Sequence, residues 1–304
     1  MNNIDVVVLT KNSAITLEAC LHGIFNSIPV NKLIIVDGGT SDATLKIARK
    51  YGAMIIYEKE NIARARYRGA LEAETQWFCF VASDIGLHPL WYKRLKKWMK
   101  YPRVAWVKGL TGEHSKILPS YALSKILRHR AHGGVALSNS LLKRDIVLKC
   151  VDWLQEDIHA GEDSVLHNFL KSKGYRVIID TTFVGCLHIP DCFLHDIYAL
   201  FRSGQSARLR HKHIRIRNLG VPVLLLRNAF IGFKDTLDPR LFAYYFDIQG
   251  ASYLLGYLGI GGIRISHFMK KIDALSKTIG IALSLNNCRN IIQKAFIIDQ
   301  TYSS

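Results

Sequence analysis

The N-terminal half of the chain alternates short apolar runs with segments of helical periodicity. The runs are predicted strands at residues 5–10, 33–36, 54–57 and 77–81. Such alternation predicts a Rossmann-like α/β architecture, with a mainly parallel central sheet flanked by helices. Ligands of such sheets bind beyond the carboxyl ends of the strands. Thr10, Asp37 and Asp84 lie at or just past the ends of predicted strands, so we expect a polar site at that edge.

The periodicity also predicts where the other elements lie. Helices are expected around residues 17–25, 41–51, 62–74, 89–100, 121–130 and 164–173, and further strands at 104–110, 135–138 and 177–180. The pattern changes near residues 190–200. We therefore expect a catalytic domain over residues 1–194 and a helical C-terminal extension over residues 195–304.

The charge of the chain is uneven. The net charge is +17. Residues 1–194 hold 26 Lys and Arg against 18 Asp and Glu, whereas residues 195–304 hold 15 against 6. The excess of the extension is concentrated in residues 208–217, beside the apolar runs 219–233 and 241–263. A basic extension of this kind suits nucleic acid, anionic lipid or a phosphorylated substrate.

Cysteine usage and the N-terminus bear on the compartment. None of the six cysteines has the C-x-x-C spacing of a zinc or redox site. Buried free thiols in a reduced cytoplasm are the simplest expectation. The apolar run 4–9 is too short for the core of a signal peptide, so none is expected.

Carboxylates near the predicted strand ends have distinct potential roles. Asp37, followed by Gly38 and Gly39, can accept hydrogen bonds from a nucleotide, or it can simply form a turn. Asp84 can hold Mg²⁺ or Mn²⁺ against a diphosphate, or it can cap a helix. Asp163, at a predicted helix start, can be a general base, or it can favour the helix dipole.

One histidine and three arginines complete the candidate site residues. His188 follows an apolar run and can serve as a metal ligand or have a structural role. Arg64 and Arg68 share one face of a predicted helix, while Arg66 points elsewhere. One of the three arginines can reach a phosphate; a solvated face is the default for the others.

Taken together, these segments resemble the family 2 glycosyltransferases of GT-A fold over about residues 4–190. The resemblance rests on a threonine-x-asparagine turn, a nucleotide-binding loop, an alanine-arginine-x-x-glycine helix and a D-x-D-like metal motif. The matching segments, in order, are Val8–Asn12, Val36–Thr44, Ala65–Gly69, Phe80–Leu87 with Pro89 and Trp91, Gly133–Gly134, Gly161–Asp163 and His188.

The resemblance implies a role for each matching residue. Asp163 would deprotonate the acceptor in a reaction that inverts the anomeric centre, and Asp84 and His188 would bind Mg²⁺ or Mn²⁺. Gly134 and Glu162 would lie on the acceptor side. The donor nucleotide would be bound by Thr10, Asn12, Asp37, Gly39, Arg66, Ser83 and Asp84. The donor would be a nucleotide-diphosphate sugar.

The chain departs from the family pattern in two places. Ala82 replaces the first carboxylate of the D-x-D motif, which predicts weaker metal binding or compensation by other ligands. Ser13 stands where the family often has glutamate.

The extension resembles the tails of some family members. Its basic run beside apolar, tyrosine-bearing segments, with Tyr244, Tyr245, Tyr253 and Tyr257, predicts an interfacial anchor on an anionic membrane surface. A helical subdomain packed on the catalytic domain and a hairpin through the bilayer are the alternatives.

The leading hypothesis is an inverting glycosyltransferase, cytoplasmic and peripheral at the inner face of the membrane, that acts on a glycan or lipid-linked hydroxyl. A sugar nucleotidyltransferase would need a glycine-rich basic loop, which residues 9–14 lack. A non-catalytic membrane-binding or nucleic-acid-binding protein leaves the carboxylates unexplained. No nucleic acid partner is expected.

Overall fold

The computed structural model describes most of the first two thirds of the chain and part of the rest. The described residues are 3–116, 118–132, 135–154, 161–190, 192, 196, 199, 200, 204, 220–242, 244, 245, 249, 250, 253 and 254. They fall into two compact units. The first unit holds Met1–Gly112 and His129–Ile189, and the second holds Glu113–Arg128 and the described part of Pro190–Ser284.

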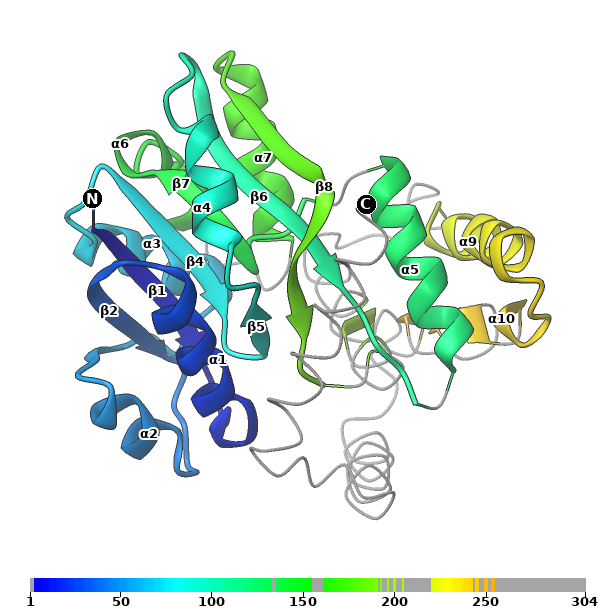
Figure 1. Cartoon of the computed structure of the whole chain (residues 1–304), viewed down its shortest axis with the longest axis horizontal. Helices are drawn as coiled ribbons and strands as arrows, with labels where there is room; N and C mark the ends of the chain where they lie inside the picture. Colours follow the sequence, from blue (N-terminus) through cyan, green and yellow to red (C-terminus); the bar gives the residue numbers. More distant parts are fainter. Residues whose placement is uncertain are drawn as a thin grey trace. The chain divides into compact units, whose positions relative to one another are not determined.

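The strands of the first unit form one eight-stranded sheet, in the order β3-β2-β1-β4-β7-β6-β8-β5 (Figure 1). The strands are β1 (Ile4–Thr10), β2 (Val30–Asp37), β3 (Met54–Tyr57), β4 (Trp77–Ala82), β5 (Ile85–Leu87), β6 (Val104–Gly112), β7 (Asn139–Lys143) and β8 (Arg176–His188). The run β3-β2-β1-β4 is parallel, as predicted. The strand β7 is antiparallel to both its neighbours, and β5 is antiparallel to β8, so the sheet as a whole is mixed.

Helices cover both faces of this sheet. They are α1 (Ala14–Ser27), α2 (Thr44–Lys50), α3 (Ile62–Glu72), α4 (Trp91–Leu95), α6 (Arg144–Val147) and α7 (Glu162–Ser172), with short 3₁₀ turns η1 (Lys96–Trp98) and η2 (Val151–Leu154). In the chain, α5 (Pro119–His132) follows β6, and α9 (Gly220–Thr236) and α10 (Arg240–Phe242) belong to the second unit. The nearly continuous burial of β1 fits two covering layers, since successive side chains point to opposite faces of the sheet.

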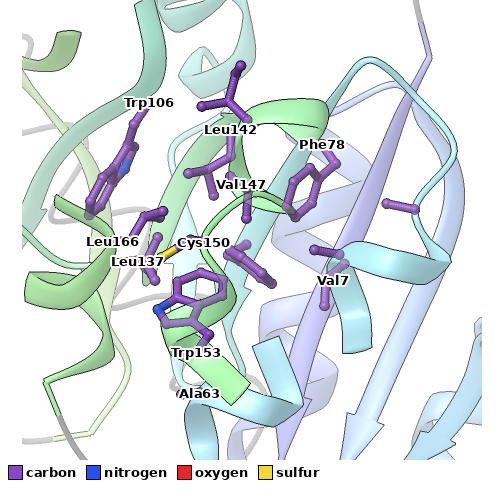
Figure 2. Close-up of a cluster of buried hydrophobic side chains, with 14 of the residues drawn as sticks. Val7, Ala63, Phe78, Trp106, Leu137, Leu142, Val147, Cys150, Trp153 and Leu166 are labelled. Carbon is purple, nitrogen blue, oxygen red and sulfur yellow. The ribbon is translucent and has the colours of Figure 1, made fainter. Parts of the chain in front are cut away.

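A core cluster fills the face of the sheet that α3, α6 and α7 cover (Figure 2). Val7 of β1 and Phe78 of β4 meet the helices there, and Trp153 of η2 packs among them. Gly69 allows α3 to lie close to the sheet, because a Cβ at this position would overlap the Val7 side chain. The glycine of the alanine-arginine-x-x-glycine segment is thus a helix-to-sheet contact point.

The second unit has its own small core. Leu118, Tyr121, Leu225, Leu241 and Tyr245 are among its buried members. Beside it lies a buried ion-pair group, in which the ammonium of Lys125 lies 2.8 Å from carboxylate oxygens of both Glu113 and Asp196.

The burial of the second unit corrects one prediction. Tyr244, Tyr245 and Tyr253 are all buried, so they are not the interfacial aromatic side chains that the sequence suggested. They face inward because rings of Tyr121, Tyr244 and Tyr245 pack edge to face. Tyr257 and the basic run 208–217 lie outside the described residues.

Two predicted elements differ in position. The strand expected at residues 135–138 is instead β7, whose first two residues are polar; Asn139 and Ser140 are buried because their side chains bond within the sheet. The helix expected from Pro89 begins at Trp91, because the N–H of His88 still bonds to the carbonyl of Gly185 in β8.

The structure also bears on the cysteines and on membrane-spanning helices. All five cysteines in the described residues are free and buried. Among the helices that the structure describes, none combines the length and apolar character needed to cross a bilayer.

Candidate active site

The loops that follow β1 and β2 are joined through Asp37. Its Oδ1 accepts hydrogen bonds from the hydroxyls of Thr10 and Thr40, and its Oδ2 accepts from the N–H groups of Gly39 and Thr40, both at 2.9 Å. An ionised carboxylate offers about four acceptor sites, and these four donors use them. Asp37 therefore organises the loop in which it sits.

Asn12 ties the same two loops together from the other side. Its N–H donates to the Thr40 hydroxyl at 3.1 Å, and its side-chain oxygen accepts from the N–H of Ser41 at 2.9 Å. Asn12 and Gly39 both have left-handed backbone, with φ of 51° and 88°. Asparagine and glycine adopt that conformation at the least steric cost, which explains these residue types at the two turns.

The loop after β4 joins this group through a pair of hydroxyls. The Oγ atoms of Ser13 and Ser83 lie 2.9 Å apart. The register of the sheet places Leu9 opposite Ala82 and Thr10 opposite Asp37, so all three loops leave the sheet at one edge. The predicted donor-site residues Thr10, Asn12, Asp37, Gly39 and Ser83 are therefore brought together.

Asp84 and His188 are neighbours on paired strands. Ile85 of β5 is in register with His188 of β8, and the N–H of Ile189 donates to the carbonyl oxygen of Asp84 at 2.8 Å. Both side chains are partly exposed, so they are accessible to a ligand.

Asp84 and His188 are the residues that the sequence predicted for a divalent cation. In the described part of the chain, no three His, Cys, Asp or Glu side chains gather as a metal site. Mg²⁺ is commonly held by one or two carboxylates together with phosphate oxygens and water. Asp84 supplies a carboxylate and His188 an imidazole, which suits a cation that shares its coordination with a bound diphosphate.

Asp163 lies in the first turn of α7, directly after Gly161 and Glu162. Its Oδ1 is buried and has no hydrogen-bond partner. Burial, and then the adjacent carboxylate of Glu162, raise the pKa of Asp163 to about 7, against the opposing positive charges of Arg66 and Lys108. A carboxylate with these properties is matched to proton transfer near neutral pH.

Arg66 makes a buried ion pair with Glu162, although the sequence suggested a contact with the donor. Its Nε lies 3.0 Å from Glu162 Oε1, and its guanidinium carbon lies 5.1 Å from the centroid of the Phe80 ring. The neighbouring Arg64 pairs with Glu60, and Arg68 with Glu58. The Arg66 side chain is thus directed to the start of α7.

Lys108 is the charged residue of the site that the sequence reasoning missed. It lies on β6 and is buried, and burial lowers its pKa. Its positive charge is one of the two that lower the pKa of Asp163. The available signal was a lysine inside the apolar run 104–110, because charged residues are seldom buried without a functional or structural reason.

Glu162 also anchors its helix through the backbone. Its carbonyl oxygen accepts a hydrogen bond from Trp153 Nε1 at 3.0 Å. Gly134, the other residue predicted for the acceptor side, lies outside the described residues.

A parallel run of strands whose carboxyl ends carry linked polar loops is the arrangement of α/β nucleotide-binding enzymes. Residues 5–146 match the model of the family described as Glycosyl transferase family 2. Residues 5–146 therefore form a family 2 glycosyltransferase domain, and the chain is a glycosyltransferase.

Solved structures with a similar course of the chain include glucosyl-3-phosphoglycerate synthase from Mycobacterium tuberculosis. Its complex with Mn²⁺, UDP-glucose and phosphoglyceric acid has a TM-score of 0.48 and 17% identity, covering 68% of this chain and 78% of that chain. Its complex with Mn²⁺, UDP and glucosyl-3-phosphoglycerate has a TM-score of 0.47 and 16% identity, with the same coverage. Likeness at this level says nothing about substrates. No curated protein matches the chain.

Proposed function

We propose that this glycosyltransferase moves a sugar from a nucleoside diphosphate to an acceptor hydroxyl with inversion, assisted by Mg²⁺ or Mn²⁺. The observation that carries the proposal is Asp163, whose buried, unpartnered Oδ1 and pKa of about 7 suit a general base. The family match of residues 5–146 supports a sugar-transfer reaction as its setting.

In the proposed reaction, Asp163 Oδ1 takes the proton of the acceptor hydroxyl while the hydroxyl oxygen bonds to the anomeric carbon. The bond between that carbon and the diphosphate breaks, and the electron pair leaves with the diphosphate. Attack from the face opposite the leaving group inverts the anomeric centre. A general base contributes roughly 10²–10⁴-fold to such a rate.

The nucleotide would lie on the loops that Asp37 and Asn12 organise. A nucleobase N–H that reaches Asp37 must replace one of its four present donors. The hydroxyls of Thr10 and Thr40 are suited to give way, because a hydroxyl can rotate to another acceptor. Gly39 leaves the backbone open to the nucleotide, and Ser83 and Asp84 border the diphosphate end.

Asp84 and His188 would hold the cation. A bound divalent cation neutralises charge that develops on the departing diphosphate. Asp84 directly precedes β5 and His188 ends β8, so both would be held by the pairing of these strands, and the Ser13–Ser83 contact joins the adjoining turn to the loop after β1.

The role we propose for Arg66 is to position the base. Its ion pair with Glu162 fixes the first turn of α7, and its positive charge limits the rise in the pKa of Asp163. Glu162 would thus affect the acceptor side of the site indirectly, by raising the pKa of Asp163.

We further propose that the acceptor is a glycan or lipid-linked hydroxyl and that the chain works at the cytoplasmic face of a membrane. The surplus of Lys and Arg in residues 195–304 supports an anionic surface as partner.

A donor panel tests the function. The full chain is incubated with UDP- and GDP-sugars, Mn²⁺ or Mg²⁺ and candidate acceptors, and release of the nucleoside diphosphate is measured together with the anomeric configuration of the product. We expect acceptor-dependent release from one class of donor and an inverted product. A retained configuration would contradict the role of Asp163, and release of pyrophosphate from a nucleoside triphosphate would favour a nucleotidyltransferase.

A further inference from the structure

The helix α9 carries an exposed apolar stripe. Leu226, Phe230 and Phe233 follow one another at spacings of four and three residues, which places them on one side of the helix, and Leu237 continues the row directly after the last helical residue. Their exposed fractions are 39%, 58%, 37% and 76%. Phe242 of α10 packs against Phe230 and Phe233, with ring centroids 4.9 and 5.6 Å apart, and widens the stripe.

This stripe is distinct from the face by which α9 packs into the second unit. The packed face consists of Leu225, Ala229 and Gly232, each one residue before a member of the stripe. The helix therefore has two neighbouring apolar faces, and only one of them is buried. Single exposed leucines are ordinary on protein surfaces, but four large apolar side chains in one row mark an interaction surface.

Leu237 adds a backbone cost to its exposure. It follows the last residue of α9 with φ of 57°, in the left-handed region that glycine and asparagine favour. A branched side chain there costs roughly 1 kcal/mol or more. A glycine would end the helix without that cost.

The charges around the stripe indicate the kind of partner. Arg227 and Lys234 are exposed, and each follows a stripe residue, so both lie on the flank opposite the packed face. Asp235 lies beyond them, farther from the stripe. The basic run 208–217, with five Lys or Arg and two His, precedes α9 in the chain. An apolar stripe bordered by cations is the pattern of a helix that lies in the plane of an anionic bilayer surface.

We propose that α9 docks the chain on an anionic lipid bilayer, with Leu226, Phe230, Phe233 and Leu237 inserted among the lipids and Arg227 and Lys234 at the phosphates. The inference rests on the proposed function only in taking a membrane as the partner, because the transfer chemistry of the first unit does not depend on it. Long basic side chains reach the headgroups while apolar neighbours enter the acyl boundary.

The test uses the full chain and vesicles of phosphatidylcholine, alone or with phosphatidylglycerol. Phe230→Trp places a probe on the stripe, and Leu224→Trp places one on another side of the same helix. We expect vesicles with phosphatidylglycerol to shift the emission of the Phe230→Trp variant to the blue, relative to the parent chain, and bromine-labelled lipids to quench it. The Leu224→Trp probe should change little.

A second variant measures affinity. Replacing the four stripe residues by glutamine should lower partitioning onto anionic vesicles roughly 100-fold or more, since each large apolar side chain contributes more than a factor of ten when buried. The matched control is Leu224→Gln, which should bind as wild type. Circular dichroism and the rate of nucleotide release should remain unchanged in both variants.

The outcomes separate the hypotheses. Vesicle binding without a change in the fluorescence of the Phe230→Trp variant would overturn the docking by α9. Membrane binding would then be assigned to the run 208–217. No binding to anionic vesicles at low salt would overturn both. A dimer in sedimentation that the glutamine variant loses would show that a second copy of the chain covers the stripe. Nucleotide release from the donor tests the transferase independently of all three.

Discussion

Arg66 Nε lies 3.0 Å from Glu162 Oε1, in a buried ion pair that joins α3 to the first turn of α7. The pair spans 96 residues of sequence. Breaking one partner of a buried pair leaves an uncompensated charge, which usually costs about 3–5 kcal/mol. Because Asp163 adjoins Glu162, the pair sets both the position and the electrostatic surroundings of the proposed base.

Removing Glu162 and removing Arg66 should shift the pH profile of activity in opposite directions. The low-pH limb of kcat/KM reports the pKa of the base in the free enzyme. Glu162→Gln removes a charge that raises the pKa of Asp163, so the limb should move to lower pH. Arg66→Gln removes a charge that lowers this pKa, so the limb should move to higher pH. Shifts on the order of one pH unit are expected.

Arg64→Gln is the control for these variants, since Arg64 lies on the same helix but pairs with Glu60 at the surface. Its limb should stay in place. The charge of Lys108 also lowers the pKa of Asp163, so the shifts should be measured with this lysine intact. Movement of both limbs in the same direction would contradict the proposed electrostatics.

Asp163→Asn should nearly abolish turnover and leave donor affinity within a few fold of wild type. A loss of about 10²–10⁴-fold is expected if Asp163 is the base, because asparagine cannot accept the proton. Calorimetry with the nucleoside diphosphate and Mn²⁺ measures the affinity. A collapse of donor affinity, with turnover restored at saturation, would make Asp163 a binding residue instead.

The same change should stabilise the protein at pH 8. The folded pKa of Asp163 is about 7, against an ordinary value of 3.8, so ionisation costs folding free energy. That cost is absent below pH 3.8, grows as pH rises to about 7 and is constant above it. Asp163→Asn should therefore raise the free energy of unfolding at pH 8 by an amount on the order of 1 kcal/mol or more, seen as a higher Tm, and lose this advantage near pH 4. Asp145→Asn, at an exposed carboxylate, should change Tm little at either pH.

Asp84→Ala should abolish transfer with little effect on Tm. Its carboxylate is partly exposed, and a metal contributes several kcal/mol of charge stabilisation in such reactions. His188→Ala should instead raise the concentration of Mn²⁺ needed for half-maximal rate, because one ligand is lost and Asp84 remains. Near-normal turnover of Asp84→Ala in Mg²⁺ and Mn²⁺ would rule out the metal assignment.

Asp5 should stabilise the fold in a pH-dependent manner. Burial alone would raise its pKa, but hydrogen bonds from Asn31 Nδ2 and from the N–H groups of Glu74 and Thr75 lower it. Its contribution is therefore present above the ordinary pKa of 3.8 and is lost as pH falls through the folded value. Asp5→Asn should lower the free energy of unfolding by about 1–3 kcal/mol at pH 7, and the difference should shrink below pH 4. Urea titrations at both pH values, with Asp145→Asn as reference, measure it.

The first four strands could be predicted because short runs of β-branched or aromatic residues end in turns, and the loops that hold Thr10, Asp37 and Asp84 followed from them. The strand β7 could not, since Asn139 and Ser140 look like loop residues until their partners Gly109 and Trp106 are in place. For the same reason the partner of Arg66 was not predictable. Helical spacing shows which way an arginine points on α3, but only the tertiary fold brings α7 to it.

The hydrogen bonds around Asp37 are made entirely by the chain's own residues. Asn12, Thr40 and Ser41 already hold each other in the left-handed turns that the site requires. Ordering a flexible loop costs conformational entropy and weakens binding. A nucleotide that binds to a loop already ordered in this way avoids that cost. Donor capture should therefore be fast and should approach a single-step encounter, so that discrimination between donors resides in their rates of departure.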